Sequence, residues 1–361
     1  MLFGLKLIKS TRLAVSISAV ALALGLAACG PSPSTDDATD GEQGASGGSD
    51  LSGDIAIDGS STVFPIPEAM AEEFQKANPG VRVTVGVSGT GGGFKKFCAG
   101  ETDISDASRP IKKSEIEACE KGGIEYVELP IAYDAISVVV NPENDFAKCL
   151  TVEELNKMWA PDAKVDNWNQ IRADFPDQKL TLYGPGTDSG TFDYFTDAIN
   201  GEEGASRGDF TASEDDNVIV QGVSNDTGAL GYFGLAYYEE NQGKLKAVEI
   251  DDGDASNGEG CVGPSVETVD DSSYQPLARP IFIYVKKEAI ARPEVKEFVD
   301  FYLATDNKSL VSEVGYIPMN EAIYTAVQAR FEKEKTGSVF EGGSTVGVKL
   351  KDILEKEEKA K

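Results

Sequence analysis

The sequence predicts an α/β protein with a mostly parallel sheet, and three observations point to that fold class. Segments with the two-residue period of a strand alternate with segments that have the period of a helix. Several predicted strands end in turns rich in Gly, Ser and Thr, at the edge where parallel sheets bind ligands. The folded part runs from about residue 54 to about residue 348, a length that suits two lobes better than one.

A strand–helix–strand unit opens the folded part. The run 55–57 has the pattern of a short strand, and the apolar spacing over 64–77 predicts a helix. Asn, Pro and Gly at 78–80 end that helix. Valines then alternate with other residues over 81–87, which predicts a second strand. A loop therefore follows the carboxyl end of each strand.

The alternation continues along the rest of the chain. Two helix starts carry the pattern of a capping box, Ser114 with Glu117 and Thr151 with Glu154. The remaining predicted strands cover 103–105, 124–130, 135–140, 180–183 and 281–285, and the remaining predicted helices cover 94–99, 151–159, 192–199, 293–304 and 320–335.

The N-terminal region has the pattern of an export signal. Basic residues precede the apolar stretch 13–26, which is too short for a comfortable membrane span. The stretch ends in Leu-Ala-Ala-Cys at 26–29, which resembles the lipobox of bacterial lipoproteins. That resemblance implies cleavage before Cys29 and lipidation of its thiol, which would tether the exported chain to a membrane. The alternative is an ordinary secretory peptide with a stray cysteine.

The segments that flank the folded part have a different composition from it. We expect 1–28 to be removed as a signal peptide. Residues 29–53 combine the lipidated cysteine with Gly, Ser, Pro, Thr and Asp, which predicts a flexible linker. Residues 349–361 form a charged tail.

The charge balance excludes several classes of function. The chain has 61 acidic and 33 basic residues, a formal net charge of −28, and no histidine. Nucleic acids and anionic lipid surfaces are poor partners for such a chain. Catalytic triads and metal sites that use histidine are excluded. A site for a small anion is compatible with this charge, because binding is local and salt screens distant charges within about 8 Å.

Cysteine usage fits an exported protein. Apart from Cys29, four cysteines remain, and an even number in this setting favours disulfides. Three connectivities are possible. The short separation of Cys98 from Cys119 favours that pair, which would leave Cys149 with Cys261. No C-x-x-C spacing occurs, so we predict no metal site.

Four polar turns share one chemistry. Each lies where a strand gives way to a helix and offers hydroxyls and small residues that expose backbone N–H groups. Helix N-termini of this kind bind anions without lysines. One such turn is an ordinary helix cap, but four predict a cage for a small tetrahedral oxyanion. The turns are 59–62, 88–91, 107–110 and 187–191.

Two of these turns carry the most specific groups. In the last turn Ser189 and Thr191 offer hydroxyls, and Gly190 and Thr191 offer backbone N–H groups. In the third turn the guanidinium of Arg109 could grip an oxyanion with two parallel hydrogen bonds. The alternative for Arg109 is a surface salt bridge, and for Ser189 an ordinary N-cap.

With these motifs in view, the chain resembles the phosphate-binding lipoproteins of high-affinity phosphate ABC transporters. The resemblance runs from the turn at 58–65 to Gly-Tyr-Ile-Pro at 315–318. Its most specific part is Ser-Gly-Thr at 189–191, which matches the phosphate-contacting motif of the family. Ser61, Thr62 and Val63 match a loop that uses hydroxyl and backbone donors, and Thr90 and Ser88 correspond to a serine before the second helix.

The resemblance implies the two-lobed type II periplasmic-binding-protein fold, in which two crossover strands join the lobes and the lobes close on the ligand. Lobe 1 would comprise 54–140 and 278–348, and lobe 2 would comprise 141–277. The crossovers would lie near 138–142 and 277–284.

Two departures from the better-known branch of the family matter. That branch has an arginine shortly before the Ser-Gly-Thr, where this chain has Gly-Pro-Gly at 184–186, and an aspartate near Ser108 that accepts the ligand proton. We infer that Arg109 supplies the guanidinium and that Asp188 holds it. Candidates for the proton acceptor are Asp106, Asp188 and Asp58. The predicted phosphate-binding residues are Ser61, Thr62, Val63, Ser88, Thr90, Ser108, Arg109, Asp188, Ser189, Gly190 and Thr191.

The resemblance implies capture of inorganic phosphate and its delivery to a membrane permease, without catalysis and without a cofactor. We expect an exported monomer that is anchored through lipid, faces the periplasm or the cell exterior, and has no nucleic-acid partner. One alternative is a binding protein for sulfate or another tetrahedral oxyanion. The other is a secreted phosphatase-like enzyme with Ser189 or Thr191 as nucleophile, although no histidine is present to act as its base.

Overall fold

The computed structural model describes residues 51–187, 189–255, 260–341, 349–350 and 352–354. The predictions for the signal peptide, for Cys29, for Asp188 and for the end of the charged tail lie outside the described residues. In the described part of the chain, no helix is both long and apolar enough to cross a membrane.

The predicted alternation of strands and helices is confirmed. The strands are β1 (Gly53–Gly59), β2 (Val81–Val87), β3 (Ile104–Ala107), β4 (Tyr126–Val140), β5 (Cys149–Thr151), β6 (Thr181–Gly184), β7 (Thr211–Ala212), β8 (Ala229–Gly234), β9 (Lys246–Ala247), β10 (Glu249–Asp251) and β11 (Ala278–Lys286). The helices are α1 (Pro65–Ala77), α2 (Thr90–Cys98), α3 (Lys113–Gly122), α4 (Val152–Trp159), α5 (Gly190–Asn200), α6 (Asp216–Asn225), α7 (Leu235–Asn241), α8 (Val266–Asp270), α9 (Lys287–Ile290), α10 (Pro293–Tyr302), α11 (Lys308–Glu313) and α12 (Glu321–Glu332), with short 3-10 helices at Trp168–Gln170 and Thr305–Asn307.

A mixed sheet runs through both lobes in the order β2-β1-β3-β11-β4-β8-β6-β7. The ladders of β1 with β2 and β3 are parallel, as is that of β6 with β8. The ladders that involve β4 or β11 are antiparallel. The α/β class is therefore confirmed, and the parallel arrangement holds within each lobe but not at the two strands that join the lobes.

Strand β4 is one continuous strand, so the prediction of two strands over 124–130 and 135–140 was wrong. No turn residues interrupt the segment, and Pro130 is tolerated because the register with β11 shifts between Ile281 and Phe282, opposite it. Residues of β4 up to Ala135 pair with β11, and those from Ile136 pair with β8. Strand β4 thus changes its pairing partner between Ala135 and Ile136.

Of the two predicted capping boxes, the one at the start of α4 is confirmed and the one at the start of α3 is not. Thr151 caps α4, and Glu154 returns the bond by accepting from the Thr151 N–H. The predicted box of Ser114 with Glu117 was wrong. Helix α3 begins at Lys113, and Glu115 accepts from the Lys112 N–H at 2.8 Å, so Ser114 lies inside the first turn.

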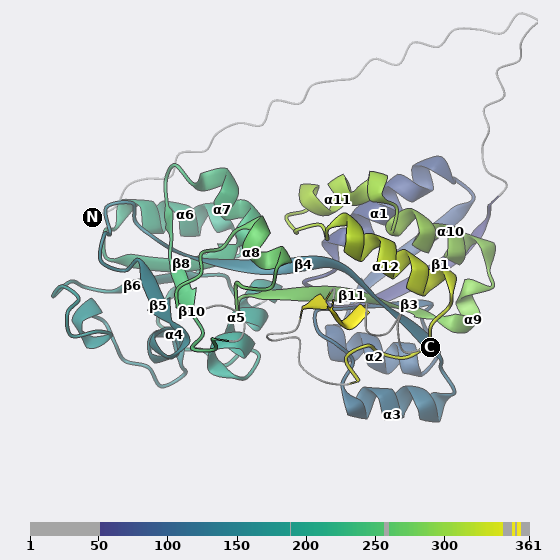
Figure 1. Cartoon of the computed structure of the whole chain (residues 1–361), viewed down its shortest axis with the longest axis horizontal. Coiled ribbons are helices and arrows are strands. Elements are labelled where there is room, and N and C mark those ends of the chain that lie inside the picture. The colour runs from purple at the N-terminus through teal and green to yellow at the C-terminus, as the bar shows by residue number, and fades with distance from the viewer. Residues whose placement is uncertain (1–50, 188, 256–259, 342–348, 351, 355–361) are drawn as a thin grey trace, which may run out of the picture. The chain divides into compact units, whose positions relative to one another are not determined.

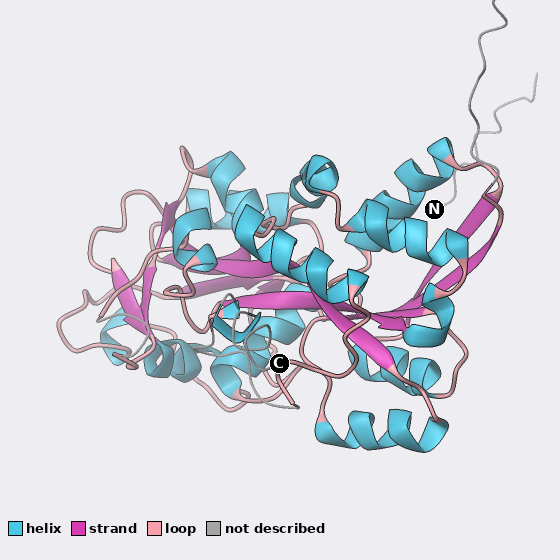
Figure 2. Cartoon of the chain, turned by 45° about the vertical axis from the view of Figure 1, so that its right-hand side comes forward, coloured by secondary structure: helices cyan, strands magenta, loops and turns pink. Residues whose placement is uncertain are grey.

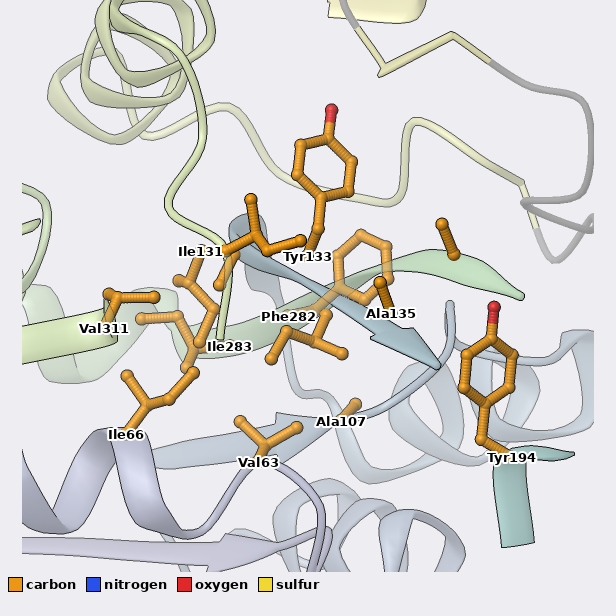
Figure 3. Close-up of a cluster of buried hydrophobic side chains, with 14 of the residues drawn as sticks. Val63, Ile66, Ala107, Ile131, Tyr133, Ala135, Tyr194, Phe282, Ile283 and Val311 are labelled. Carbon is orange, nitrogen blue, oxygen red and sulfur yellow. The ribbon is translucent and has the colours of Figure 1, made fainter. Parts of the chain in front are cut away.

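Helices cover both faces of the sheet (Figures 1 and 2). In the first lobe α1, α10, α11 and α12 lie on one face, while α2 and α3 lie on the other. In the second lobe α6 and α7 lie opposite α4 and α5. Figure 3 shows part of the core, where Val63 and Ala107 gather with Phe282 and Tyr133 at the point where β4 and β11 run together.

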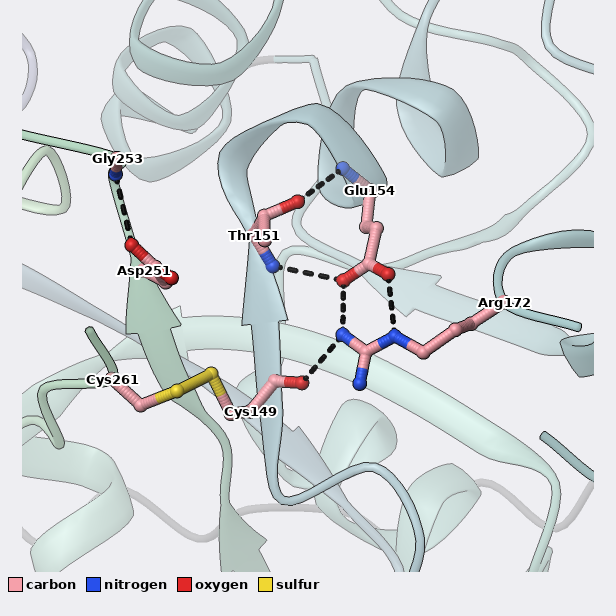
Figure 4. Close-up of a disulfide and its surroundings, with 7 residues drawn as sticks. All are labelled: Cys149, Thr151, Glu154, Arg172, Asp251, Gly253 and Cys261. Carbon is pink, nitrogen blue, oxygen red and sulfur yellow. Dashed lines mark hydrogen bonds and ion pairs between the residues drawn. A yellow bond between two sulfur atoms is a disulfide. The ribbon is translucent and has the colours of Figure 1, made fainter. Parts of the chain in front are cut away.

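Both favoured disulfides are present. Cys98 is bonded to Cys119, which joins α2 to α3, and Cys149 is bonded to Cys261. Figure 4 shows that the second bond stands beside the short ladder of β5 with β10. Arg172 braces the same region, because it donates to both carboxylate oxygens of Glu154 at 2.7 Å.

Replacement of Gly93 by alanine tests how closely α2 lies on the end of β1. A Cβ on Gly93 would lie 2.6 Å from the Gly59 Cα and 2.8 Å from the Asp58 carbonyl oxygen. We expect Gly93→Ala to destabilise the fold by about 1–3 kcal/mol in denaturant titration. The matched control is Gly91→Ala in the same helix, whose Cβ would make only ordinary contacts. Equal stability of the two variants would contradict this packing.

Candidate functional site

The three polar turns of the first lobe lie together at one edge of the sheet. They follow β1, β2 and β3, which are adjacent and parallel, so their carboxyl ends meet. The loops are joined through their backbones. The Ser60 N–H donates to the Asp106 carbonyl at 3.1 Å, and the Ser88 N–H donates to the Gly59 carbonyl at 3.0 Å.

The first loop is anchored in the core by the side chain of Val63. Val63 is fully buried in the core, so only its backbone can serve a ligand. Tyr316 donates from its hydroxyl to the Thr62 carbonyl. This bond fixes the loop from a segment distant in sequence.

The hydroxyls of the second and third turns form hydrogen bonds within the first lobe. Thr90 and Ser108 share a hydrogen bond between their Oγ atoms at 3.0 Å, and the Ser108 N–H donates to Thr90 Oγ1 at 3.2 Å. Ser88 donates to Asp58 Oδ1, and Lys96 binds the other oxygen of the same carboxylate at 2.6 Å. Thr90 and Ser108 are therefore brought together, while Ser88 is held by Asp58.

The fourth turn reaches the first turn from the other lobe. Ser189 is the N-cap of α5, and its Oγ accepts from the Thr191 N–H at 3.2 Å. A Cβ on Gly190 would lie 2.8 Å from the Thr62 Cα and would overlap the Thr62 hydroxyl. The N-terminus of α5 thus abuts the loop that follows β1.

Arg109 is held within its own lobe. Its two terminal nitrogens each donate to an oxygen of Glu115 at 2.9 Å, and Nη1 also donates to the Pro110 carbonyl at 3.1 Å. Burial opposes the charge, but Glu115 outweighs it and raises the pKa of the Arg109 guanidinium. The carboxylate that grips Arg109 is thus Glu115, whereas Asp188 was expected to hold it and lies outside the described residues. This ion pair occupies the two terminal nitrogens, whereas Arg109 Nε has no hydrogen-bond partner in the described residues.

Among the described candidates for the proton acceptor, Asp106 differs from Asp58. Asp106 is fully buried beside Gly59, and neither of its carboxyl oxygens has a hydrogen-bond partner in the described residues. Burial raises the pKa of Asp106 to about 8, although the nearby backbone N–H groups of Asp106 and Ser60, which do not reach hydrogen-bond geometry, oppose the rise. Asp58 is engaged with Ser88 and Lys96. Within the described ranges, no acidic or cysteine cluster could hold a metal ion.

A buried ion pair near the site was missed from the sequence. Arg279 of β11 contacts Asp134 of β4 at 3.2 Å, and both side chains are buried. Both lie in largely apolar strands, but β4 also contains Glu128 and β11 ends at Lys286, so the sequence does not single out this pair. The roles of Glu115 and Tyr316 were not predicted either, because no local sequence pattern identifies Arg109 and the Thr62 carbonyl as their partners.

The fold and the site define a class of protein. Two α/β lobes are joined by two crossing strands, and helix N-termini of both lobes meet, as in binding proteins that close on a small ligand. A family model described as "PBP superfamily domain" matches residues 36–306. The chain therefore belongs to the PBP superfamily, the periplasmic binding proteins that serve transporters as substrate-binding subunits.

Relatives place the chain more narrowly. It is 55% identical to the protein SphX of Synechococcus elongatus over 305 residues, which cover 84% of this chain and 88% of the relative. It is 40% identical to the phosphate-binding protein PstS of Staphylococcus haemolyticus, over 76% of this chain and 84% of that one. The crystal structure of a possible phosphate binding protein from Planctomyces limnophilus is 51% identical, with a TM-score of 0.74 over 79% of this chain and 99% of that one. The chain belongs to the family of these SphX and PstS proteins.

Replacement of Gly190 by alanine tests the contact between the lobes. The added Cβ would collide with Thr62, so the two loops could no longer approach. We expect binding of a tetrahedral oxyanion, probed with inorganic phosphate by calorimetry, to weaken by about tenfold or more, as for loss of one charged hydrogen bond. Small-angle scattering should report a larger radius of gyration. Gly208→Ala, whose Cβ would meet nothing within 4 Å, is the control. Unchanged affinity in Gly190→Ala would contradict the described contact.

Proposed function

We propose that this protein captures inorganic phosphate reversibly and delivers it to the membrane permease of an ABC transporter. One observation supports the proposal most strongly. Polar turns from both lobes converge, and the one on α5 abuts the one after β1. A converging set of neutral donors suits a small anion that must be released again. The names of the PstS relatives supply the choice of phosphate.

The proposed contacts are the predicted ones. Backbone N–H groups and hydroxyls surround the anion when the lobes close, and Arg109 stands beside it as a cation that Glu115 holds in place. The change of partner along β4 supports a boundary between the lobes near Ala135. The proposed phosphate-binding residues are Ser61, Thr62, Val63, Ser88, Thr90, Ser108, Arg109, Asp188, Ser189, Gly190 and Thr191.

Binding without chemistry is part of the proposal. The Ser189 hydroxyl accepts a hydrogen bond from its own helix, and the chain has no histidine to activate it. Calorimetry with phosphate, sulfate and arsenate tests the function, together with an assay of phosphomonoester hydrolysis. We expect tight, saturable phosphate binding with one ion per chain and no turnover. Hydrolysis that is lost in Ser189→Ala would instead favour a phosphatase.

We further propose that Asp106 distinguishes phosphate from sulfate. While it holds a proton, below about pH 8, it can donate to either anion. Once ionised it repels sulfate, whereas hydrogen phosphate can still donate its own proton to the carboxylate. A site that depends on such a bond can reject the analogue by a large factor. The preference for phosphate should therefore rise with pH.

The selectivity of Asp106→Asn tests this role. In the unchanged protein, the ratio of the sulfate Kd to the phosphate Kd should increase as the pH rises through about 8. In Asp106→Asn the ratio should stay flat, since the amide always offers a donor. Asp58→Asn is the control and should keep the pH dependence, moved to lower pH because the Asp58 charge helps to raise the pKa of Asp106. A pH dependence that survives in Asp106→Asn would remove Asp106 from this role.

Export and anchoring complete the proposal. We propose that the monomer is exported, that 1–28 are cleaved, and that the lipidated Cys29 tethers it to the membrane through the linker. The variant Cys29→Ser should be released from the membrane fraction into the soluble fraction. Its phosphate affinity should be unchanged, because the tether lies outside both lobes. A variant that still partitions with membranes would contradict the lipid anchor.

A further inference from the structure

The buried arginines of the described residues differ in what holds them. Arg207 donates to the Met158 and Val165 carbonyls and to Asp209, which is an arrangement that braces a loop. Arg279 is different, because it donates only to a single carboxylate oxygen of Asp134, at 3.2 and 3.3 Å. Its guanidinium is thus a buried charge with spare donor capacity.

The pair of Arg279 and Asp134 occupies the junction of the lobes. The two residues stand directly opposite each other in the ladder of β11 with β4. The next pair in the ladder is Ala278 with Ala135, and Ala278 is the first residue of β11. After Ala135, strand β4 pairs with β8 instead of β11. The pair therefore lies where both crossing strands pass between lobes.

On one side the pair meets the helix that carries the fourth turn. The Arg279 guanidinium lies 3.7 Å from the centre of the Tyr194 ring. Tyr194 belongs to α5, which begins at Gly190, and its hydroxyl donates to the Pro276 carbonyl at 2.7 Å. A cation over an aromatic ring at this distance is strongly attracted when both are desolvated.

The charges of the pair also act on Tyr316, the residue that fixes the first loop. Burial raises the pKa of Tyr316, the Asp134 charge adds to the rise, and the Arg279 charge opposes it. The same Tyr316 hydroxyl donates to the Thr62 carbonyl. Arg279 is therefore linked to both loops that meet at Gly190 and Thr62, through the ring of Tyr194 in α5 and through its charge effect on Tyr316.

We propose that Arg279 is a positioning residue that supplies positive potential to the oxyanion site from the junction of the lobes, and that Asp134 moderates it. This inference rests on the proposed phosphate binding. A buried charge acts over a longer distance than an exposed one, because little water screens it.

The ion pair with Asp134 explains how the Arg279 guanidinium can be buried when no anion is bound. An unpaired guanidinium in the core would be strongly destabilising, and Asp134 compensates it. The pair has no net charge, but it is a dipole whose positive end lies against Tyr194 and α5. The pair thus attracts an anion at the start of α5 without making an open site unstable.

The inference is tested by replacing each member of the pair in turn, because the two replacements should change the phosphate affinity in opposite directions. Arg279→Met and Asp134→Asn both break the ion pair, so a merely structural role would weaken phosphate binding in both. Our inference predicts that Arg279→Met weakens binding by about tenfold and that Asp134→Asn tightens it by a similar factor, the order expected for one buried charge. The double variant should return close to the unchanged affinity. Calorimetry at about pH 8 measures all three.

Two further measurements keep the result decisive. Arg207→Met, which removes another buried arginine, should lower Tm without changing the phosphate affinity. If Arg279→Met does not fold, Asp134→Asn alone decides, because weaker binding in that variant would overturn the inference. Weaker binding in both single variants would overturn it as well. Absence of phosphate binding in the unchanged protein would instead refute the proposed function.

Discussion

The structure depends on one pairing, the antiparallel ladder between β4 and β11. Every other part of the sheet is attached to one of these two strands, directly or through a neighbour. In the first lobe β11 bonds β3, and in the second lobe β4 bonds β8. Because side chains alternate across the sheet, the register of this ladder decides which residues face the core and which face the junction. It places Asp134 directly opposite Arg279.

The arrangement resolves an apparent conflict between the acidic chain and an anion site. The donors that we propose for the anion are, apart from Arg109, backbone N–H groups and hydroxyls of Ser and Thr, which carry no net charge. Their direction comes from helix starts that are fixed by the sheet, so they need not be ordered again when an anion arrives. Among the described residues few acidic side chains are buried, and salt screens the charges that face water.

Features that depend on residues close together in the chain, such as turns and helix caps, could be predicted from the sequence. The turns after β1, β2, β3 and β6 were found because each combines a strand end with a helix start, and Thr151 with Glu154 forms the expected cap. The position of Arg109 at a helix start was visible, but its partner Glu115 was not, since Ser114 offered a more conventional box. The pairing of Asp134 with Arg279 joins residues 145 positions apart, and no local signal specifies such a partner.

The order of strands has a consequence for how the chain is made. Strand β11 lies between β3 and β4, although it is synthesised long after both. The first lobe therefore cannot close its sheet until Lys286 has emerged, and until then the edges of β3 and β4 stay open. Late insertion of a central strand thus delays closure of the sheet through topology alone.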